Sequence, residues 1–281
     1  LYVLIITEVS SVCIGSKIVI FTKYLHTKMV KLSAVIITYN EERNIEKCLQ
    51  SLVTIANEIV VVDSFSTDST KSICLKYKVK FIEQKFLGYI EQKNFALTQA
   101  SYNHVVSLDG DESLSETLQN SILKLKNNWI LDGYYCNRLN DFCGQWIKHS
   151  DWYPNKKLRV FNRTKANWAG INPHDHIKLK NSASKAGHLK GDILHKTYQT
   201  YSEFNQKTEY FSTIAAKAYF DNGKKAPIWK IIFNPTWAFF KAYVLRLGFL
   251  DGFNGFVICV QTANITFLKY SKLRELYKNK C

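Results

Sequence analysis

The sequence predicts an α/β fold in which a mostly parallel sheet is flanked by helices. Short, continuously apolar runs alternate along the chain with segments of helical periodicity, as expected of strands that are buried on both faces and covered by helices. Polar residues gather directly after those runs, where open sheets of this class bind ligands. After about residue 202 the pattern is helical throughout, which predicts a C-terminal helical elaboration.

The first two predicted strands are the almost wholly apolar runs Leu32–Ile37 and Glu58–Val62. Between them, Asn40 suits the N-cap of a helix, and the two Glu residues that follow suit its first turn. Apolar residues at positions 45, 48, 49 and 52 continue at helical spacing. We therefore expect an amphipathic helix to begin directly after Asn40.

The same alternation continues along the chain to about residue 126. The later elements are expected as a helix from the polar turn 64–69 to about Tyr77, a strand at Val79–Ile82, a helix containing Gln92–Asn94, a strand at His104–Leu108 and a helix at about Ser115–Lys126. From residue 133 the segments are mixed and aromatic, and Ile228–Phe249 is dense in aromatic residues interleaved with Lys and Arg.

Residues 1–28 differ from the rest of the chain. The only Met, Met29, leads directly into the first predicted strand. Glu8 and Lys17 interrupt the preceding stretch, so it falls short of the ~20 apolar residues that a spanning helix needs, and its flanks do not fit a signal peptide. We expect 1–28 to be an upstream extension outside the functional fold, 29–200 to be the ligand-binding domain and 201–281 to be a helical C-terminal region.

Positive charge is concentrated in the second half of the chain. Residues 1–140 hold 15 basic and 14 acidic residues, whereas residues 141–281 hold 23 and 9, a net charge of +14. A cationic half implies an anionic partner, namely nucleic acid, anionic lipid or a phosphorylated substrate, unless it only maintains solubility. Because charged residues and a Pro interrupt Ile228–Phe249, we expect a membrane-surface helix rather than a spanning one. A helix packed on the core is the alternative.

The seven Cys residues show no CxxC spacing, and their number is odd. This pattern argues against a structural zinc site and against a complete disulfide framework. We expect free thiols in a reducing compartment, most of them buried as small hydrophobic residues.

Polar residues follow three of the predicted strands: Thr38-Tyr39-Asn40 follows the first, Asp63 follows the second, and Asp109 and Asp111 follow the strand at His104–Leu108. The carboxyl ends of parallel strands meet at one edge, so we expect a single site, although any one acid alone would suit a helix cap. Two carboxylates in Asp109-Gly110-Asp111 suit Mg²⁺ or Mn²⁺, which takes further ligands from substrate phosphates.

A nucleoside diphosphate would supply those phosphates. The turn after the first strand has neither a P-loop nor GxGxxG, which disfavours P-loop ATP binding and NAD binding. Tyr39 could instead stack on a base, and Asp63 could accept a hydrogen bond from its ring N–H.

A series of motifs in a fixed order now points to a known family. They are Val35–Glu42, Ile59–Asp68, Gln92–Asn94, Leu108–Glu112, Gly144–His149, Trp152–Pro154, Leu158–Phe161, His174-Asp175 and Gly248–Gly252. Together they cover about residues 32–275 and resemble the family 2 inverting glycosyltransferases with the GT-A fold. The similarity is greatest to the branch that adds sugars to the lipopolysaccharide core.

The resemblance implies a nucleotide-sugar site with a bound Mg²⁺ or Mn²⁺. The donor would contact Thr38, Tyr39, Glu41, Asp63, Lys93 and Asp109, with Asp63 recognising the base. Asp111 would bind the metal together with Asp109, as a DXD motif. The branch usually has Ala where this chain has Gly110, and we expect no effect because the middle side chain need not touch the ligand.

An inverting transfer needs a carboxylate that takes the proton of the acceptor hydroxyl. The branch tends to have His-Glu where this chain has His174-Asp175, so we expect Asp175 to be the base. Glu112 is the alternative base, unless it is only an acid in the first turn of a helix.

The resemblance and the residue types indicate acceptor contacts at Trp152, Tyr153, Arg159 and His174. Aromatic packing and a solvated edge are the alternatives for these residues.

The sequence therefore predicts a metal-dependent inverting glycosyltransferase. It would move a sugar, expected to be UDP-linked, to a glycolipid such as lipopolysaccharide core, at the cytoplasmic face of the plasma membrane and without a nucleic-acid partner. Two alternatives are a nucleotidyltransferase on a similar sheet and a non-catalytic nucleic-acid-binding protein. The first normally has a Gly-rich basic loop where Asn40-Glu41-Glu42 stands, and the acids at the strand ends oppose the second.

Overall fold

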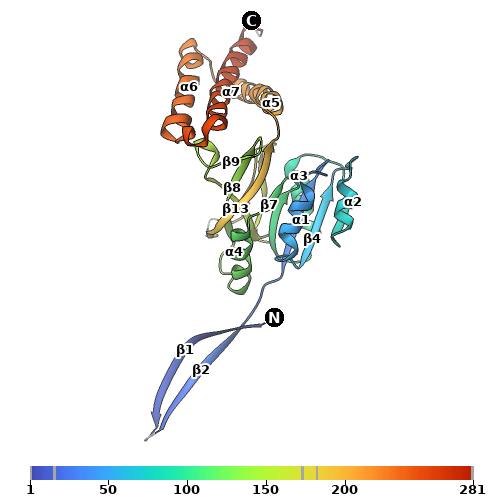
Figure 1. Ribbon diagram of the computed structural model, residues 1–281, viewed down its shortest axis with the longest axis vertical. Coiled ribbons are helices and arrows are strands. Elements are labelled where there is room, and N and C mark those ends of the chain that lie inside the picture. The colour runs from blue at the N-terminus through green and yellow to red at the C-terminus, as the bar shows by residue number, and fades with distance from the viewer. Residues whose placement is uncertain (1, 15–16, 172–173, 182, 280–281) are drawn as a thin grey trace. The chain divides into compact units, whose positions relative to one another are not determined.

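The computed structural model describes residues 2–14, 17–171, 174–181 and 183–279, and at 2–28, 171 and 174 it describes the backbone alone. Strands β1 (Tyr2–Ile14) and β2 (Lys17–Lys28) pair antiparallel with each other and form a separate two-stranded sheet (Figure 1). That these residues lie outside the functional fold stays a prediction.

The centre of the main sheet is parallel. Strand β3 (Leu32–Thr38) pairs with β4 (Glu58–Asp63) on one side and β6 (His104–Asp109) on the other, and β4 pairs with β5 (Lys80–Glu83). Every residue of β3 is buried. Burial on both faces explains the unbroken apolar run and confirms the four predicted strands.

Beyond β6 the sheet is mixed. Strand β10 (Asn155–Asn162) runs antiparallel to β6, and the order is β5-β4-β3-β6-β10-β8-β13-β7, with β9 paired to β8. The other strands are β7 (Glu112–Leu114), β8 (Gly133–Phe142), β9 (Gln145–Ile147) and β13 (Ala186–Tyr198). The predicted mostly parallel sheet was wrong for this half. In the described part of 133–198 the one helical segment is the short η1 (Ser150–Trp152), and parallel pairing needs a long crossover.

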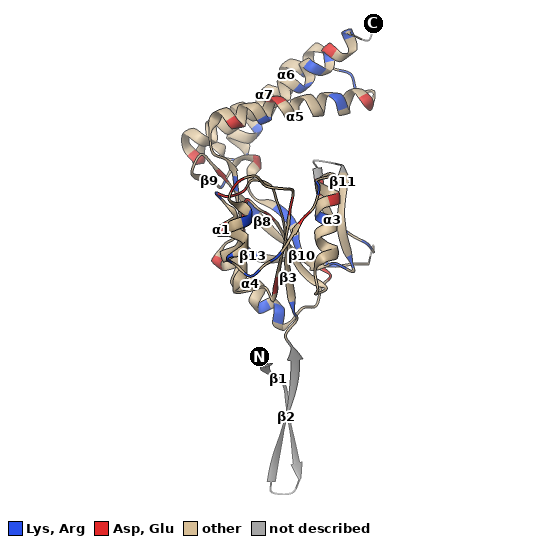
Figure 2. Ribbon diagram, turned by 90° about the vertical axis from the view of Figure 1, so that its right-hand side faces the viewer, with Lys and Arg blue, Asp and Glu red and all other residues tan. Residues whose placement is uncertain are grey.

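Helices cover both faces of the parallel strands. On one face, α1 (Ile45–Val53), α2 (Thr70–Leu75) and α4 (Glu116–Asn127) contribute to one buried apolar cluster that contains Leu32 and Ile36 of β3. On the other face, α3 (Tyr89–Gln99) packs against Val35 and Ile37. Figure 2 shows α1 and α4 on the opposite side of β3 from α3. The predicted α/β layering is therefore confirmed.

Helix α1 begins at Ile45 and not directly after Asn40. The backbone of Asn40 has a positive φ of 53°, and its side-chain oxygen accepts a hydrogen bond from Thr67 N at 2.8 Å. Asn40 therefore joins the loops after β3 and β4, and the prediction that it caps the helix was wrong. Ser115 does cap α4, where its Oγ accepts from Leu118 N.

The chain forms two compact units. The first unit comprises residues 1–136 and 157–193, and the second comprises residues 137–156 and 194–281. In the second unit, Phe142 and Ile147 share a buried cluster with Phe204 and Ile258. Residues 137–156 therefore pack with the C-terminal helices. A boundary at residue 200 would separate these two parts of the unit. The functional domain boundary at residue 200 stays a prediction.

The second unit contains the predicted C-terminal helices. They are α5 (Tyr201–Asp221), α6 (Ile228–Phe240) and α7 (Gly252–Lys278), with the short segments η2 (Lys241–Leu245) and η3 (Gly248–Asp251) before α7. Helix α7 packs against both α5 and α6.

The Cys side chains that the structure describes are free thiols, as expected: Cys48, Cys74, Cys136, Cys143 and Cys259. Burial raises the pKa of Cys136 to about 12, with further contributions from nearby charges. Cys13 and Cys281 lie outside the described side chains.

Candidate active site

Three strand ends come together at one edge of the sheet. The strand register places Thr38 beside Asp63, and Ile37 beside Asp109. The amide of Gly110 donates a hydrogen bond to Ile37 O, so the turn after β6 stays close to the end of β3. The prediction that these polar residues share one edge is confirmed.

The loop after β4 holds the loop after β3. Asp63 is buried, and its carboxylate accepts hydrogen bonds from the amide and the hydroxyl of Ser66. The amide of Glu41 donates to Thr70 Oγ1 at 2.8 Å. The Tyr39 ring is 57% exposed, so it is accessible for stacking. Because both Asp63 oxygens already bind Ser66, its recognition of a base stays a prediction.

A buried lysine connects Asp109 to Asp175, the predicted base. Lys93 on α3 lies with its Nζ 2.9 Å from Asp109 Oδ1 and 2.8 Å from Asp175 Oδ2. Its side chain is 4% exposed, and the ammonium also lies 4.3 Å from the centre of the Trp168 ring. Asp175 belongs to β12 (His174–Leu179), which pairs antiparallel with β11 (Ala166–Ile171).

Arg159 is the second buried cation of this cluster. Its Nη2 lies 3.0 Å from Glu112 Oε1 and 3.4 Å from Asp109 Oδ2. Burial alone would lower the pKa of the guanidinium, but the carboxylates of Glu112, Asp109 and Asp175 outweigh burial and raise it. Arg159 therefore stays charged and fixes Asp109. A contact with an acceptor would require it to leave these partners.

Glu112 belongs to the same cluster of buried charges as Arg159 and Asp109. Its Oε2 accepts a hydrogen bond from Asp109 N at 3.0 Å, and its side chain is fully buried. It begins β7 and does not lie in the first turn of a helix, so that expectation was wrong. Because Glu112 holds both Asp109 and Arg159, its position suits positioning better than proton transfer from an acceptor.

Three consecutive residues of α3 point to three parts of the site. Gln92 Nε2 donates to Ser64 Oγ at 3.1 Å in the loop after β4. Lys93 binds the two acids, and Asn94 exchanges two hydrogen bonds, each 3.0 Å, with the backbone of Trp168. The Gln-Lys-Asn motif was the sequence signal for this arrangement, but the partners of Gln92 and Asn94 were not predicted.

Asp111 follows Asp109 on the turn that leads to β7. Among the residues that the structure describes, no three His, Cys, Asp or Glu side chains converge on a point that would hold a metal. Asp109 is already engaged by two cations. One or two carboxylates can hold Mg²⁺ or Mn²⁺ when phosphates and water supply the other ligands. They are too few to coordinate the ion with protein ligands alone.

Gly110 is tightly enclosed. A Cβ at this position would lie 2.8 Å from Thr38 Oγ1 and 3.1 Å from Glu41 Cγ. Both neighbours belong to the predicted donor site. We expected Ala at this position to have no effect because the side chain need not touch the ligand. An Ala side chain would nevertheless crowd Thr38 and Glu41, so that expectation does not hold for the packing of the protein.

The predicted acceptor residues are divided between the units. Trp152 and Tyr153 belong to the second unit, where Trp152 lines a cavity, and Arg159 belongs to the first. The side chain of His174 lies outside the described side chains. Sequence reasoning did not predict that Trp168 would contact both site cations, 4.3 Å from Lys93 and 4.9 Å from Arg159.

The family model for glycosyl transferase family 2 matches residues 33–179. An uncharacterised glycosyltransferase of Rickettsia bellii (strain RML369-C) is 33% identical over 258 residues, which cover 88% of this chain and 87% of the relative. The lipopolysaccharide core biosynthesis glycosyltransferase LpsC of Rhizobium meliloti (strain 1021) is 29% identical over 252 residues, or 87% of this chain and 92% of LpsC.

Among solved structures, the mannosyltransferase PcManGT from Pyrobaculum calidifontis, in complex with GDP-Man and Mn²⁺, has a similar fold. The TM-score is 0.51 at 16% sequence identity, over 88% of each chain. This similarity identifies the fold as GT-A-like α/β.

Proposed function

We propose that this chain, which belongs to glycosyl transferase family 2, moves a sugar from a nucleotide-sugar to a glycolipid acceptor with inversion at the anomeric carbon. Family membership makes it a glycosyltransferase, and it removes the reason for considering a nucleotidyltransferase or a nucleic-acid-binding protein.

One observation carries the proposal: Asp109 at the end of β6 and Asp175 share a single buried cation. Lys93 contacts Asp109, which ends β6, and Asp175, which comes from β12. A donor diphosphate at the strand ends and an acceptor hydroxyl at Asp175 would therefore lie on either side of the same ammonium. This is the arrangement that a direct displacement between two substrates requires.

Asp111, with help from Asp109, would hold Mg²⁺ or Mn²⁺. The ion would neutralise charge on the departing diphosphate. Arg159 and Glu112 keep Asp109 in place through the contacts at 3.4 and 3.0 Å. The chain's own contribution here is thus a carboxylate whose orientation is fixed before the donor arrives.

In the proposed reaction, Asp175 takes the proton of the acceptor hydroxyl. The hydroxyl oxygen forms a bond to the anomeric carbon while the bond from that carbon to the diphosphate oxygen breaks on the opposite face. The electron pair leaves with the diphosphate, and the configuration inverts. Lys93 positions Asp175 and faces the negative charge that develops on the diphosphate.

The similarity to LpsC supports an acceptor of the lipopolysaccharide core type. We expect a UDP-linked donor from the sequence motifs. PcManGT was solved with GDP-Man, so a GDP-linked donor is the natural comparison.

The surface of α6 supports a peripheral position on the inner face of the plasma membrane. In the described part of the chain, no single helix is long and apolar enough to span a bilayer, although the bent pair Ile228–Leu245 and Gly248–Lys278 satisfies length and composition together. Helix α6 buries none of its residues, and Phe233 and Trp237 are 66% and 58% exposed. Exposed aromatic residues beside Lys230 suit the interface of an anionic bilayer.

A transfer assay tests this function. The full chain is incubated with Mn²⁺, a lipopolysaccharide acceptor truncated in its core, and labelled UDP-glucose, UDP-galactose, UDP-N-acetylglucosamine or GDP-mannose. We expect label in the acceptor from one donor, and a β-linkage by NMR from an α-linked donor. Transfer with retention would contradict the inverting mechanism, and no transfer from any donor would contradict the proposed substrates.

A further inference from the structure

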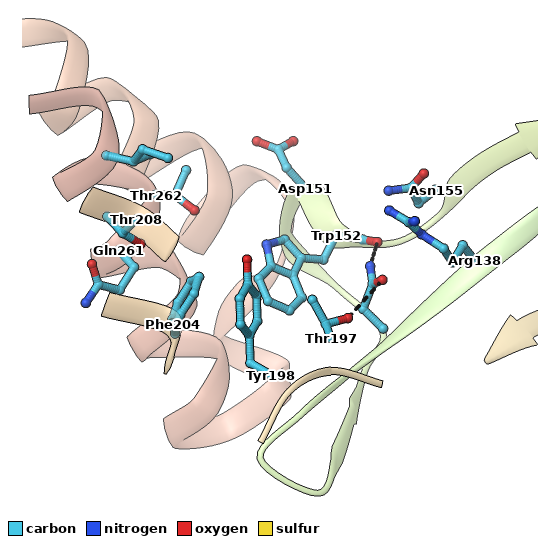
Figure 3. Close-up of a pocket in the computed structure, with 12 residues that line it drawn as sticks. Arg138, Asp151, Trp152, Asn155, Thr197, Tyr198, Phe204, Thr208, Gln261 and Thr262 are labelled. Atoms are coloured by element: carbon cyan, nitrogen blue, oxygen red, sulfur yellow. Dashed lines mark hydrogen bonds between the residues drawn. The ribbon is translucent and has the colours of Figure 1, made fainter. Parts of the chain in front are cut away.

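The second unit contains a cavity of about 300 Å³ that the proposed chemistry does not use (Figure 3). Its volume equals that of about ten water molecules, which is room for one sugar ring with its hydroxyl groups. Six residues matter for its chemistry, and they come from the three strands β8, β10 and β13, from η1 and from α7: Arg138, Trp152, Asn155, Thr197, Tyr198 and Gln261. All belong to the second unit.

One wall of the cavity is aromatic and firmly held. The Trp152 and Tyr198 rings lie 5.9 Å apart with an interplanar angle of 40°, and Phe142 and Phe204 each meet the indole edge-on at 5.8 Å. Asn140 Nδ2 donates to the carbonyl of Trp152 and so fixes its backbone. A pre-formed aromatic face of this kind matches the apolar C–H face of a pyranose ring.

Polar groups stand on both sides of that wall. Figure 3 shows Arg138 and Asn155 on the strand side of Trp152, and Gln261 on the side of α7. The Asn155 carboxamide has no hydrogen-bond partner among the residues that the structure describes, so it offers a donor and an acceptor. Burial and the nearby Glu203 carboxylate raise the pKa of Tyr198, so its hydroxyl remains a donor at neutral pH.

The charge of the cavity argues against a phosphate ligand. Among its described lining residues, Arg138 and Asp151 are the charged ones, and they cancel. Asp151 also pairs with Lys241 at 3.3 Å and with Arg246 at 3.6 Å, and neither of these cations lines the cavity. A nucleotide or a lipid phosphate would need an excess of cations or a metal, whereas a neutral sugar needs amides, hydroxyls and an aromatic face.

We propose that this cavity binds one neutral pyranose unit of a glycan, with the ring stacked on Trp152 and its hydroxyl groups hydrogen-bonded to Asn155 and Gln261. The source of that glycan rests on the proposed function, in which the acceptor carries the sugar. The cavity would then select the acceptor through a sugar unit bound by the second unit.

Saturation-transfer NMR on the full chain tests this inference. The probes are the methyl glycosides of glucose, galactose, mannose and N-acetylglucosamine. We expect ring-proton signals from at least one of them. Asn155→Ala should weaken that signal about fivefold, as expected for the loss of one hydrogen bond, and Thr262→Trp, which fills the cavity from α7, should abolish it. Asn222→Ala, which removes an exposed carboxamide that donates to Ala218 O at the end of α5, outside the cavity, is the control and should have no effect.

Asn155→Ala is a mild truncation that keeps the test meaningful if the bulkier Thr262→Trp does not fold, and circular dichroism checks both. Absence of signal from all four glycosides, or a signal that survives both variants, would overturn the inference. UDP and GDP binding measured on the same samples reports separately on the proposed function. Asp111→Ala should lose nucleotide binding and keep the glycoside signal.

Discussion

The ammonium of Lys93 lies 2.8 Å from the carboxylate of Asp175, although 82 residues separate them in the sequence. The same ammonium lies 2.9 Å from Asp109. In this structure the predicted base is therefore neutralised by a cation that a donor diphosphate would also attract. Binding of the donor would compete for Lys93 and release Asp175 to accept a proton. This predicts a preferred order in which the donor binds first.

Replacing Lys93 by Met should impair both folding and catalysis. The side chain is 4% exposed, so its removal leaves Asp109 and Asp175 without their shared counter-ion. Breaking such a buried pair typically costs about 3–5 kcal/mol of unfolding free energy, and kcat/KM should fall about 10²-fold or more. Urea unfolding and initial rates measure the two effects. Lys93→Arg, which keeps the charge, should retain more activity than Lys93→Met, and equal losses in both variants would argue against an electrostatic role.

Replacing Asp175 by Asn should abolish proton transfer while leaving donor binding intact. The carboxamide oxygen can still accept from Lys93, so the local structure should hold. Loss of a general base lowers kcat by about 10²–10⁴-fold. Steady-state kinetics against donor concentration separates kcat from KM. Unchanged turnover in Asp175→Asn would remove it as the base and return attention to Glu112.

Replacing Gly110 by Ala should weaken donor binding about tenfold, because the new methyl group would meet Thr38 Oγ1 at 2.8 Å. Overpacking of this kind costs about 1–3 kcal/mol. The double variant Gly110→Ala with Thr38→Ala removes the hydroxyl and should recover part of the loss relative to the single variants. Nucleotide titration measures all four proteins. Strict additivity of the two changes would show that the contact does not matter.

Replacing Phe233 by Asp should reduce binding to anionic vesicles. Phe233 is 66% exposed on α6, and an acid there opposes both the apolar and the electrostatic contribution. Flotation with phosphatidylglycerol vesicles measures binding, with phosphatidylcholine vesicles for comparison. Leu87→Asp, at a site that is 68% exposed in the first unit, is the matched control. If both variants bind as strongly as the unaltered chain, α6 is not the membrane surface.

The parallel strands could be predicted because they are buried on both faces. Strand β3 has seven buried residues in succession, so the apolar run alone reveals it. The position of the site at the strand ends could be predicted as well, since parallel strands present their carboxyl ends on one edge of the sheet. The antiparallel strand β10 gave no comparable signal, because it begins with the polar residues Asn155–Lys157 and its buried part is interrupted by Arg159.

The cations of the site could be named from the sequence, but their partners could not. Arg159 was expected at an acceptor, whereas its contacts are with Glu112 and Asp109, 47 and 50 residues earlier. Asn40 failed as a helix cap for a similar reason, since its oxygen binds Thr67, 27 residues later. Local propensity cannot account for a hydrogen bond to a distant loop.

Calorimetric titration of UDP and of GDP into the full chain, with Mn²⁺ and then with EDTA, tests whether the strand-end site holds a nucleoside diphosphate through Asp111. We predict that one nucleotide binds only with Mn²⁺, and that Asp111→Ala weakens this binding about tenfold or more. Asp221→Ala, at the exposed end of α5, should bind like the unaltered chain. Failure of both nucleotides to bind with Mn²⁺ present, or binding that is equally strong in Asp111→Ala, would contradict the proposed donor site.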